Sequence, residues 1–137
     1  MAQIHTYNPR KVTVSLGSHI VTGYADDSMI NIEYAGDGTS VIVGADGEVT
    51  RTIDPSKMYN FKLALQQNSK TNEFLQKCYD KDQVDGSGTF PINVNDLLGK
   101  EKFVGEIAWV SKPAAWGRGK ASTNREWEIV VGEGNFA

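Results

Sequence analysis

The sequence has few of the residues that build catalytic sites. Its 137 residues include two histidines and one cysteine. A nucleophilic site needs a serine or cysteine beside a base and an orienting carboxylate, and no spacing along the chain suggests such a set. His5 lies in a terminal segment, and His19 begins a predicted strand. We therefore expect a protein that is not an enzyme and that needs no cofactor.

A single cysteine also excludes an internal disulfide, which suits a reducing compartment. Cys78 lies on the apolar side of a predicted helix, where we expect it to act as a small buried hydrophobic residue. The run containing Asp80, Asp82 and Asp85 resembles a calcium loop only weakly, because it lacks the glutamate ligand at the twelfth position. We expect no metal site there.

The chain also lacks a basic excess and a long apolar run. It has 14 Lys and Arg against 17 Asp and Glu, a net charge of −3, whereas broad nucleic-acid binding needs clustered cations. No run approaches the roughly 18 apolar residues of a membrane span, and the N-terminal MAQIHTYNPRK has no apolar signal region. These absences predict one soluble domain without a membrane anchor.

Alternating apolar and polar residues indicate a mainly β fold. We expect strands within residues 11–16, 19–24, 29–34, 40–54 (a hairpin), 58–66, 89–94, 103–110 and 125–131. Apolar residues spaced by four predict one helix over 70–81 with Ser69 as its N-cap, followed by a loop over 82–88. Short turns between so many strands predict two packed antiparallel sheets, as a barrel or sandwich, flanked by the helix. Residues 1–10 are an N-terminal arm and residues 11–137 a single β domain.

The loop over residues 111–122 combines an aromatic residue with cations. A tryptophan among glycine, alanine and lysine is costly to expose, so Trp116 suggests contact with another molecule. The basic cluster of this loop consists of Lys112, Arg118 and Lys120. We expect the cluster to face outward.

The hairpin over residues 40–54 turns at Ala45, Asp46 and Gly47. Strand alternation then places Val49, Arg51 and Ile53 on one face. The opposite face consists of hydroxyls and carboxylates only: Glu48, Thr50, Thr52 and Asp54. Plain solvent exposure of one side of an antiparallel sheet accounts for this pattern on residue chemistry alone.

Three sequence segments together resemble the tail tube proteins of long-tailed bacteriophages, particularly contractile-tailed ones. They are GYADDSMINIEY at 23–34, VGADGEVTRT at 43–52 and LQQNSKTNEFL at 65–75. That family is similar in fold to the tube subunits of type VI secretion systems and tailocins. The resemblance implies a structural protein of the virion tail, made in the host cytoplasm, whose hexameric rings share sheets and stack into a tube. DNA would pass through the lumen without specific binding, and sheath, baseplate and tape-measure proteins would be partners.

The resemblance gives the hairpin pattern a stronger explanation, because a channel for DNA needs a wall without free cations. It implies that the lumen is lined by Glu48, Thr50, Thr52 and Asp54. Arg51, on the other face, is expected to pair with a carboxylate at a subunit or sheet boundary. The candidates for ring stacking and subunit contact are Ile4, Tyr7, Arg10, Ala45, Asp46, Gly47, Arg51, Trp116 and Arg118.

Two other functions remain open from the residues. A carbohydrate-binding β-sandwich could use Trp116 and a neighbouring aromatic residue as a stacking platform. A small barrel hydrolase is disfavoured by the scarcity of histidine, cysteine and paired carboxylates.

Overall fold

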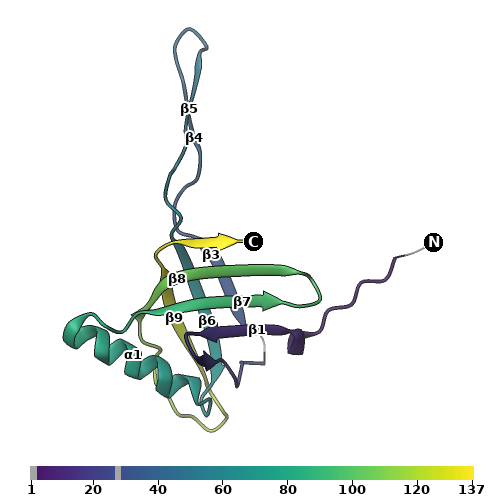
Figure 1. Ribbon diagram of the computed structural model, residues 1–137, viewed down its shortest axis with the longest axis vertical. Helices are drawn as coiled ribbons and strands as arrows, with labels where there is room; N and C mark the ends of the chain where they lie inside the picture. The colour runs from purple at the N-terminus through teal and green to yellow at the C-terminus, as the bar shows by residue number, and fades with distance from the viewer. Residues whose placement is uncertain (1–2, 27–28) are drawn as a thin grey trace.

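A computed structural model describes residues 3–26 and 29–137. Residues 1 and 2 of the predicted N-terminal arm therefore lie outside the described residues, as do residues 27 and 28 of the segment GYADDSMINIEY. The chain forms a β body, a helix at one side, an N-terminal arm and a long projecting hairpin (Figure 1).

Within the described residues, ten strands, one α-helix and one short 3-10 helix follow in chain order. They are η1 (Pro9–Lys11), β1 (Val12–Leu16), β2 (His19–Ile20), β3 (Ile30–Tyr34), β4 (Ser40–Val43), β5 (Val49–Thr52), β6 (Tyr59–Gln66), α1 (Thr71–Asp85), β7 (Phe90–Asp96), β8 (Glu101–Lys112), β9 (Asn124–Val131) and β10 (Gly134–Phe136). Every described strand pair is antiparallel. The predicted fold class, mainly β with one helix, is confirmed.

Eight strands share one sheet, in the order β2-β1-β7-β8-β9-β6-β3, with β10 beside β8. The sheet bends so strongly that it makes two layers. The first layer holds β2, β1, β7, β10 and the start of β8, and the second holds the end of β8 with β9, β6 and β3. In Figure 1, strands β1, β7 and β8 run across the front and β6, β9 and β3 cross behind them.

Strand β8 joins the two layers. Its first half pairs with β7 and β10, and its last residues pair with β9, with register shifts between Phe90 and Ile92 on β7 and between Val110 and Lys112 on β8. Gly105 lies at this bend, where a Cβ atom would overlap the Val131 side chain and lie 3.1 Å from Ile92 Cγ2. Glycine is therefore required for the layers to approach each other.

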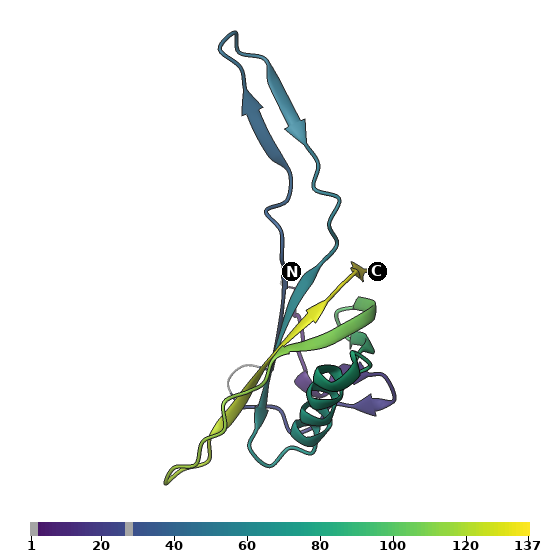
Figure 2. The same ribbon diagram turned by 90° about the vertical axis from the view of Figure 1, so that its left-hand side faces the viewer.

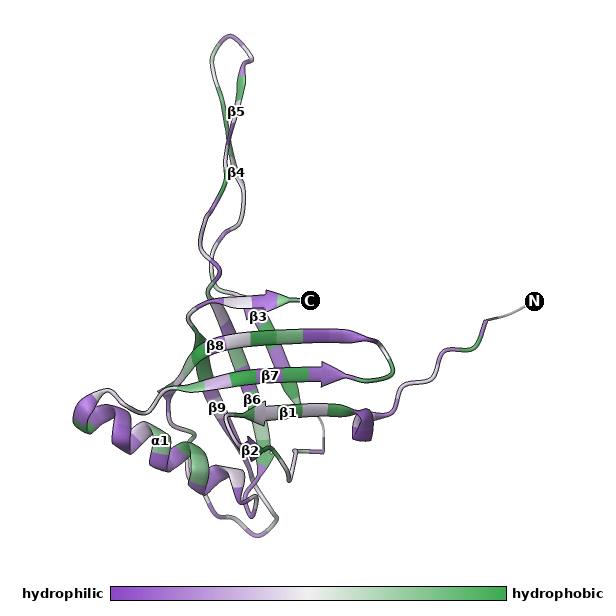
Figure 3. Ribbon diagram, in the orientation of Figure 1, coloured by the Kyte–Doolittle hydropathy of each residue, from purple (hydrophilic) through white to green (hydrophobic). Residues whose placement is uncertain are grey.

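The core lies between the two layers. Its largest fully buried side chains are Trp127, Phe61 and Phe103, and Trp127 pairs across strands with Leu63. Figure 3 shows the hydrophobic residues alternating with polar ones along these strands, while the helix is mostly hydrophilic. The alternation in the sequence therefore gave the correct inward positions in β6 and β9.

Helix α1 begins one residue after the predicted start and ends at Asp85 rather than at residue 81. Lys70 takes the N-cap position in place of the predicted Ser69, whose hydroxyl oxygen instead accepts from the Thr71 backbone N–H at 3.2 Å. Gly86 ends the helix in the left-handed conformation, with φ at 73°. The prediction of a loop over 82–88 is wrong in its first half, because Asp82 and Asp85 belong to the helix.

Buried hydrogen bonds hold the start of the helix on the sheet. Trp127 Nε1 donates to Asn72 Oδ1 at 2.9 Å, and Asn72 Nδ2 donates to the Gln66 carbonyl at 2.9 Å. His19 Nε2 lies 2.9 Å from Thr71 Oγ1, and its ring stacks on Phe74 with centroids 4.5 Å apart. These groups fix where the helix crosses the sheet, and His19 is part of that packing.

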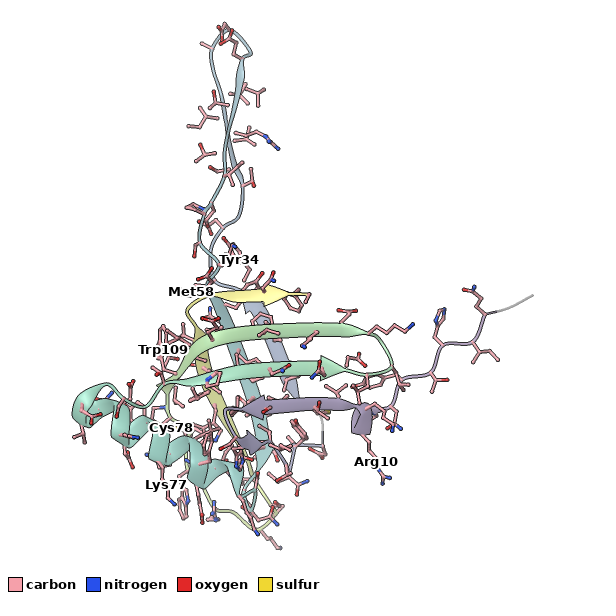
Figure 4. All side chains as sticks on the ribbon, in the orientation of Figure 1. Arg10, Tyr34, Met58, Lys77, Cys78 and Trp109 are labelled. Atoms are coloured by element: carbon pink, nitrogen blue, oxygen red, sulfur yellow. The ribbon has the colours of Figure 1, made fainter. Side chains whose placement is uncertain are left out.

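Cys78 is half-buried and packs against the core from the helix. Burial raises the pKa of its thiol. The predicted position on the apolar side of the helix is confirmed, although the side chain is not fully buried. Figure 4 shows it beside the exposed Lys77.

We expect replacement of Gly105 by alanine to lower the free energy of unfolding by about 1–3 kcal/mol, because the added methyl group overpacks the bend. Gly117→Ala is the matched control, since a Cβ there meets nothing within 4 Å, and its effect should stay within about 0.5 kcal/mol. Urea unfolding followed by tryptophan fluorescence measures both. Equal midpoints for the two variants would show that the bend tolerates a side chain.

Candidate assembly surfaces

The hairpin of β4 and β5 projects far from the body and forms a sheet of its own (Figures 1 and 2). All eight residues of the two strands are exposed. Neither strand of the hairpin is therefore buried against the domain. In the part of the chain that the structure describes, the two strands pair with each other and with no other strand, because the chain leaves the body after β3 and returns to it at β6.

The two faces of the hairpin differ in chemistry. Cross-strand pairs Val41–Arg51 and Val43–Val49 share one face, and pairs Ser40–Thr52 and Ile42–Thr50 share the other. The side chains of Val41, Val43 and Val49 are 55–63% exposed. The first face, which we call the apolar hairpin face, leaves aliphatic surface in water that a monomer has no means of burying.

The tip of the hairpin is a tight turn with two carboxylates. The Gly47 N–H donates to the Gly44 carbonyl at 3.0 Å, and Gly47 has φ at 88°, a conformation that favours glycine. Asp46 Oδ1 accepts from the Glu48 N–H at 3.1 Å. The predicted turn at residues 45–47 is confirmed, and the tip carries negative charge only.

Aromatic contacts anchor the base of the hairpin. The Tyr34 hydroxyl donates to the Ser56 carbonyl at 2.8 Å, and its ring meets the edge of Tyr59 at 5.5 Å between centroids. Asp54 Oδ1 accepts from the Ser56 N–H at 2.9 Å. Desolvation and the nearby Asp54 carboxylate raise the pKa of Tyr34. Figure 4 shows Tyr34 and Met58 at the junction of hairpin and body.

The second layer turns one face toward the core, and its opposite face is mainly polar, with Trp109 and Val130 as an apolar cross-strand pair at the β8 side. We call the outward side the polar face; its members on β3, β6 and β9 include Asn31, Glu33, Asn60, Lys62, Glu126 and Glu128. Charges alternate across the strands, because Lys62 pairs with Glu128 and Glu128 pairs with Lys112. Three carboxylates face two lysines, a net of −1.

The second layer also has open edges. In the part of the chain that the structure describes, β3 pairs with β6 alone. At the other side, the β7 partner of β8 stops at Ala108, so the stretch from Trp109 to Lys112 pairs only with β9. Unpaired strand edges present rows of free N–H and C=O groups that can take up a further strand.

The loop between β8 and β9 is folded onto the start of α1. Gln67 Oε1 accepts from the Thr123 N–H at 3.3 Å and from its hydroxyl at 3.2 Å, and the Thr123 hydroxyl also lies 2.9 Å from the Gly117 carbonyl. Trp116 remains 66% exposed, and the Arg118 guanidinium lies 4.1 Å from the centre of its ring. The tryptophan is therefore presented at the surface by an organised loop.

The predicted site residues fall into separate groups. Glu48, Thr50 and Thr52 lie along the hairpin and Asp54 at its base, and the lumen position of all four stays a prediction. Arg51 is exposed on the apolar hairpin face. Ile4, Tyr7 and Arg10 belong to an arm that leads away from the body (Figure 4), and Ile4 is 92% exposed. Trp116 and Arg118 are in contact with each other.

The sequence interpretation missed the polar face of the second layer. Its signal was present, because Glu126 and Glu128 alternate with the buried Trp127. The basic cluster is also divided. Lys112 joins the polar face as a partner of Glu128, whereas Arg118 and Lys120 lie in the loop.

Among residues 3–26 and 29–137, no group of three or more His, Cys, Asp or Glu side chains is arranged to hold a metal ion. The one α-helix in that part of the chain is neither long nor apolar enough to span a bilayer.

The fold is similar to that of chains in solved contractile injection systems. The sheath/tube terminator of an extracellular contractile injection system, PVC, in its extended state, has a TM-score of 0.68 at 12% identity, covering 99% of each chain. The tube-terminating cap of the anti-feeding prophage has a TM-score of 0.65 at 10% identity, covering 100% of this chain and 94% of that one. A chain of the PVC sheath–tube complex in its extended state has a TM-score of 0.63 at 12% identity, covering 96% of this chain and 91% of that one.

Comparison of the amino-acid sequence identifies relatives among phage proteins. The chain is 26% identical over 140 residues to structural protein ORF10 of Pseudomonas phage KPP10, covering 96% of this chain and 80% of that protein. Residues 9–135 match the family of the bacteriophage PhiTE tail tube protein, and the chain belongs to that family. It is a structural protein of the phage tail, and the resemblance seen in the sequence is confirmed.

We expect Gln67→Ala to loosen the Trp116 loop without unfolding the body. Losing the two bonds to Thr123 removes about 1 kcal/mol of local stability, so amide hydrogen exchange over residues 113–123 should accelerate about fivefold. Gln76→Ala is the control, because the Gln76 amide bonds only Asp80 on the exposed side of the helix. Equal exchange in both variants would mean that Gln67 does not hold the loop.

Proposed function

We propose that this chain is the repeating subunit of a phage tail tube, in which six copies close a ring and rings stack around a channel for DNA. The open edges at β3 and at the end of β8 support ring closure, since one copy's β3 can pair with the next copy's β8. Edge pairing of this kind joins second layers into one continuous sheet and removes the free edges. The observation that carries the proposal is a layer with two open edges and one uncovered polar face.

The polar face of the second layer forms the channel wall. It offers carboxylates, amides and two lysines, and each lysine has Glu128 as its cross-strand partner. A lysine compensated in this way attracts phosphate less than a free one, so DNA can slide past it. With −1 from each subunit, six copies give the wall a net charge of −6, and the lumen is mildly acidic.

The hairpin extends the tube beyond each ring. It leaves the body from β3 and β6, which are strands of the wall layer. We propose that Thr50, Thr52 and Asp54, with Glu48 near the tip, continue the channel lining. The apolar hairpin face then packs on a neighbouring subunit, where Arg51 finds a carboxylate.

Stacking uses the segments at the ends of the subunit. These are the arm with Ile4, Tyr7 and Arg10, the tip at Ala45, Asp46 and Gly47, and the loop with Trp116 and Arg118. In the virion, sheath, baseplate and tape-measure proteins would contact the tube from outside, from its end and from its lumen. DNA passes without a specific binding site, and the subunit resides in the host cytoplasm before assembly.

A carbohydrate-binding module is the alternative. It needs a free aromatic platform, and one face of Trp116 is occupied by Arg118. It also offers no reason for the exposed aliphatic residues of the hairpin or for the open edges. A tube subunit accounts for both the exposed aliphatic residues and the open edges.

Electron microscopy of the purified protein tests the function. We expect sixfold rings or smooth tubes with a hole a few nanometres wide, roughly a DNA duplex plus clearance, given its groove dimensions. A protein that stays monomeric at high concentration, and whose tryptophan fluorescence responds to glycans, would contradict the tube and support the carbohydrate module.

We expect Val43→Thr with Val49→Thr to reduce assembly while leaving the subunit folded. The two positions are exposed in the free subunit, so its free energy of unfolding should change by less than about 0.5 kcal/mol. Each copy loses apolar burial at the contact, at roughly 25 cal/mol per Å². The critical concentration, measured by sedimentation, should rise about tenfold or more.

Ile42→Thr is the matched control, because Ile42 lies on the other face of the same hairpin. It should change the critical concentration far less. A larger effect from Ile42→Thr than from the valine pair would show that the contact is not made by the apolar hairpin face.

A further inference from the structure

The hairpin tip and the Trp116 loop lie at opposite ends of the molecule. In Figure 1 the hairpin reaches the top of the longest axis, and the yellow-green loop between β8 and β9 lies at the bottom beside the start of α1. Figure 2 shows the same separation after a quarter turn. A contact between these two features is therefore impossible within one chain and natural between two copies stacked along this axis.

The tip is acidic. Residues 44–48 read Gly-Ala-Asp-Gly-Glu, with two carboxylates and no cation. All five residues are exposed, and the Asp46 carboxylate uses one oxygen for the turn while the other stays free of it. The tip thus offers a compact charge of −2 on a narrow, preformed turn.

The opposite end holds a cationic pocket. Its lining includes the helix residues Lys70, Glu73 and Lys77, together with Trp116, Arg118 and Arg125. Four cations against one carboxylate give a net of +3. Figure 4 shows Lys77 at this lower side of the molecule. The pocket combines an exposed aromatic ring with guanidinium groups, the two side-chain types that dominate protein contacts.

The two guanidinium groups in this pocket lie over tryptophan rings and donate to backbone carbonyls, with Arg118 Nη1 donating to Gly117 at 2.8 Å. Arg125 donates from Nη2 to the Ala114 carbonyl at 3.0 Å, but its Nε is buried without a hydrogen-bond partner in the described chain. Burial, with the charge of Arg118 adding to it, lowers the pKa of Arg125. An anion placed in the pocket relieves this repulsion.

We propose that the acidic hairpin tip of one copy docks into the Trp116–Arg118 pocket of a second copy in the next ring. The occupant is a second copy because this chain carries both complementary surfaces, at opposite ends. Such a contact is heterologous, so it leaves a free tip and a free pocket at the two ends and propagates without closing. This inference rests on the proposed function, to which it adds the partner surfaces of ring stacking.

Weak single contacts suffice for this role. An exposed ion pair changes an association constant only about threefold. Six parallel contacts in a proposed ring multiply to about 700-fold, because the ring binds as one multivalent body. Charge changes at the tip should therefore act on ring stacking much more strongly than on the subunit itself.

Charge exchange tests the proposal. The reversed tip, Asp46→Lys with Glu48→Lys, and the reversed pocket, Lys77→Glu with Arg118→Glu, should each abolish sedimentable tubes at about 0.1 M salt, where the Debye length is about 10 Å. A chain carrying all four changes should form tubes again. Glu101→Lys reverses one charge on the exposed start of β8, away from both surfaces; it is the control and should assemble normally.

Cross-linking tests the same contact without charge changes. Ala45→Cys and Gly117→Cys in one chain, with Cys78→Ala, should give an oxidised ladder of dimers, trimers and longer species. Ala45→Cys with Lys102→Cys should give no such ladder. Circular dichroism and thermal melting must match the parent for every variant.

The outcomes separate this inference from the function. Tubes that form equally well with the reversed tip, or a four-change chain that folds but does not assemble, overturn the docking and leave the tube function standing. The absence of a ladder in the Ala45 and Gly117 pair, when microscopy shows tubes, overturns it as well. A parent protein that makes neither rings nor cross-links overturns both.

Discussion

The shared strand β8 is the constraint on which the fold depends. Its first half serves one layer and its second half the other, so the eight-stranded sheet must turn sharply in the middle of a strand. The absence of a side chain at Gly105 lets Val131 and Ile92 come close at that turn. The layers then face each other over one core, and the outward side of the second layer is left without a cover.

That uncovered side explains features that make little sense in a monomer. The second layer exposes a polar face and two open edges, and from its strands rises a hairpin with aliphatic side chains in water. Exposed edges and apolar ribbons promote association. In the proposed ring, the edges would pair with neighbouring subunits and the aliphatic side chains would be buried against them, so the same features would serve assembly.

The sequence predicted what depends on local periodicity. Alternation in 58–66 and 125–131 gave the inward side chains of β6 and β9, and the glycine-ended turn gave the hairpin. It did not reveal that β4 and β5 leave the body, because alternation reports the faces of a strand and not what lies against them. The short β10 has too few residues to show a periodic pattern. Helix α1 continues beyond its apolar pattern to Asp85, because Gly86 is the residue that ends it.

The charges of the polar face alter the sequence-based view of the channel. The sequence led us to expect a wall of carboxylates and hydroxyls alone, whereas the polar face, which is the proposed wall, has Lys62 and Lys112 on either side of Glu128 across three neighbouring strands. Sliding DNA requires that no run of free cations track its phosphates, which a pattern of alternating sign also satisfies. Cross-strand neighbours lie well within the Debye length of about 8 Å at physiological salt. Lys62 and Lys112 therefore share the Glu128 carboxylate as a close neighbour.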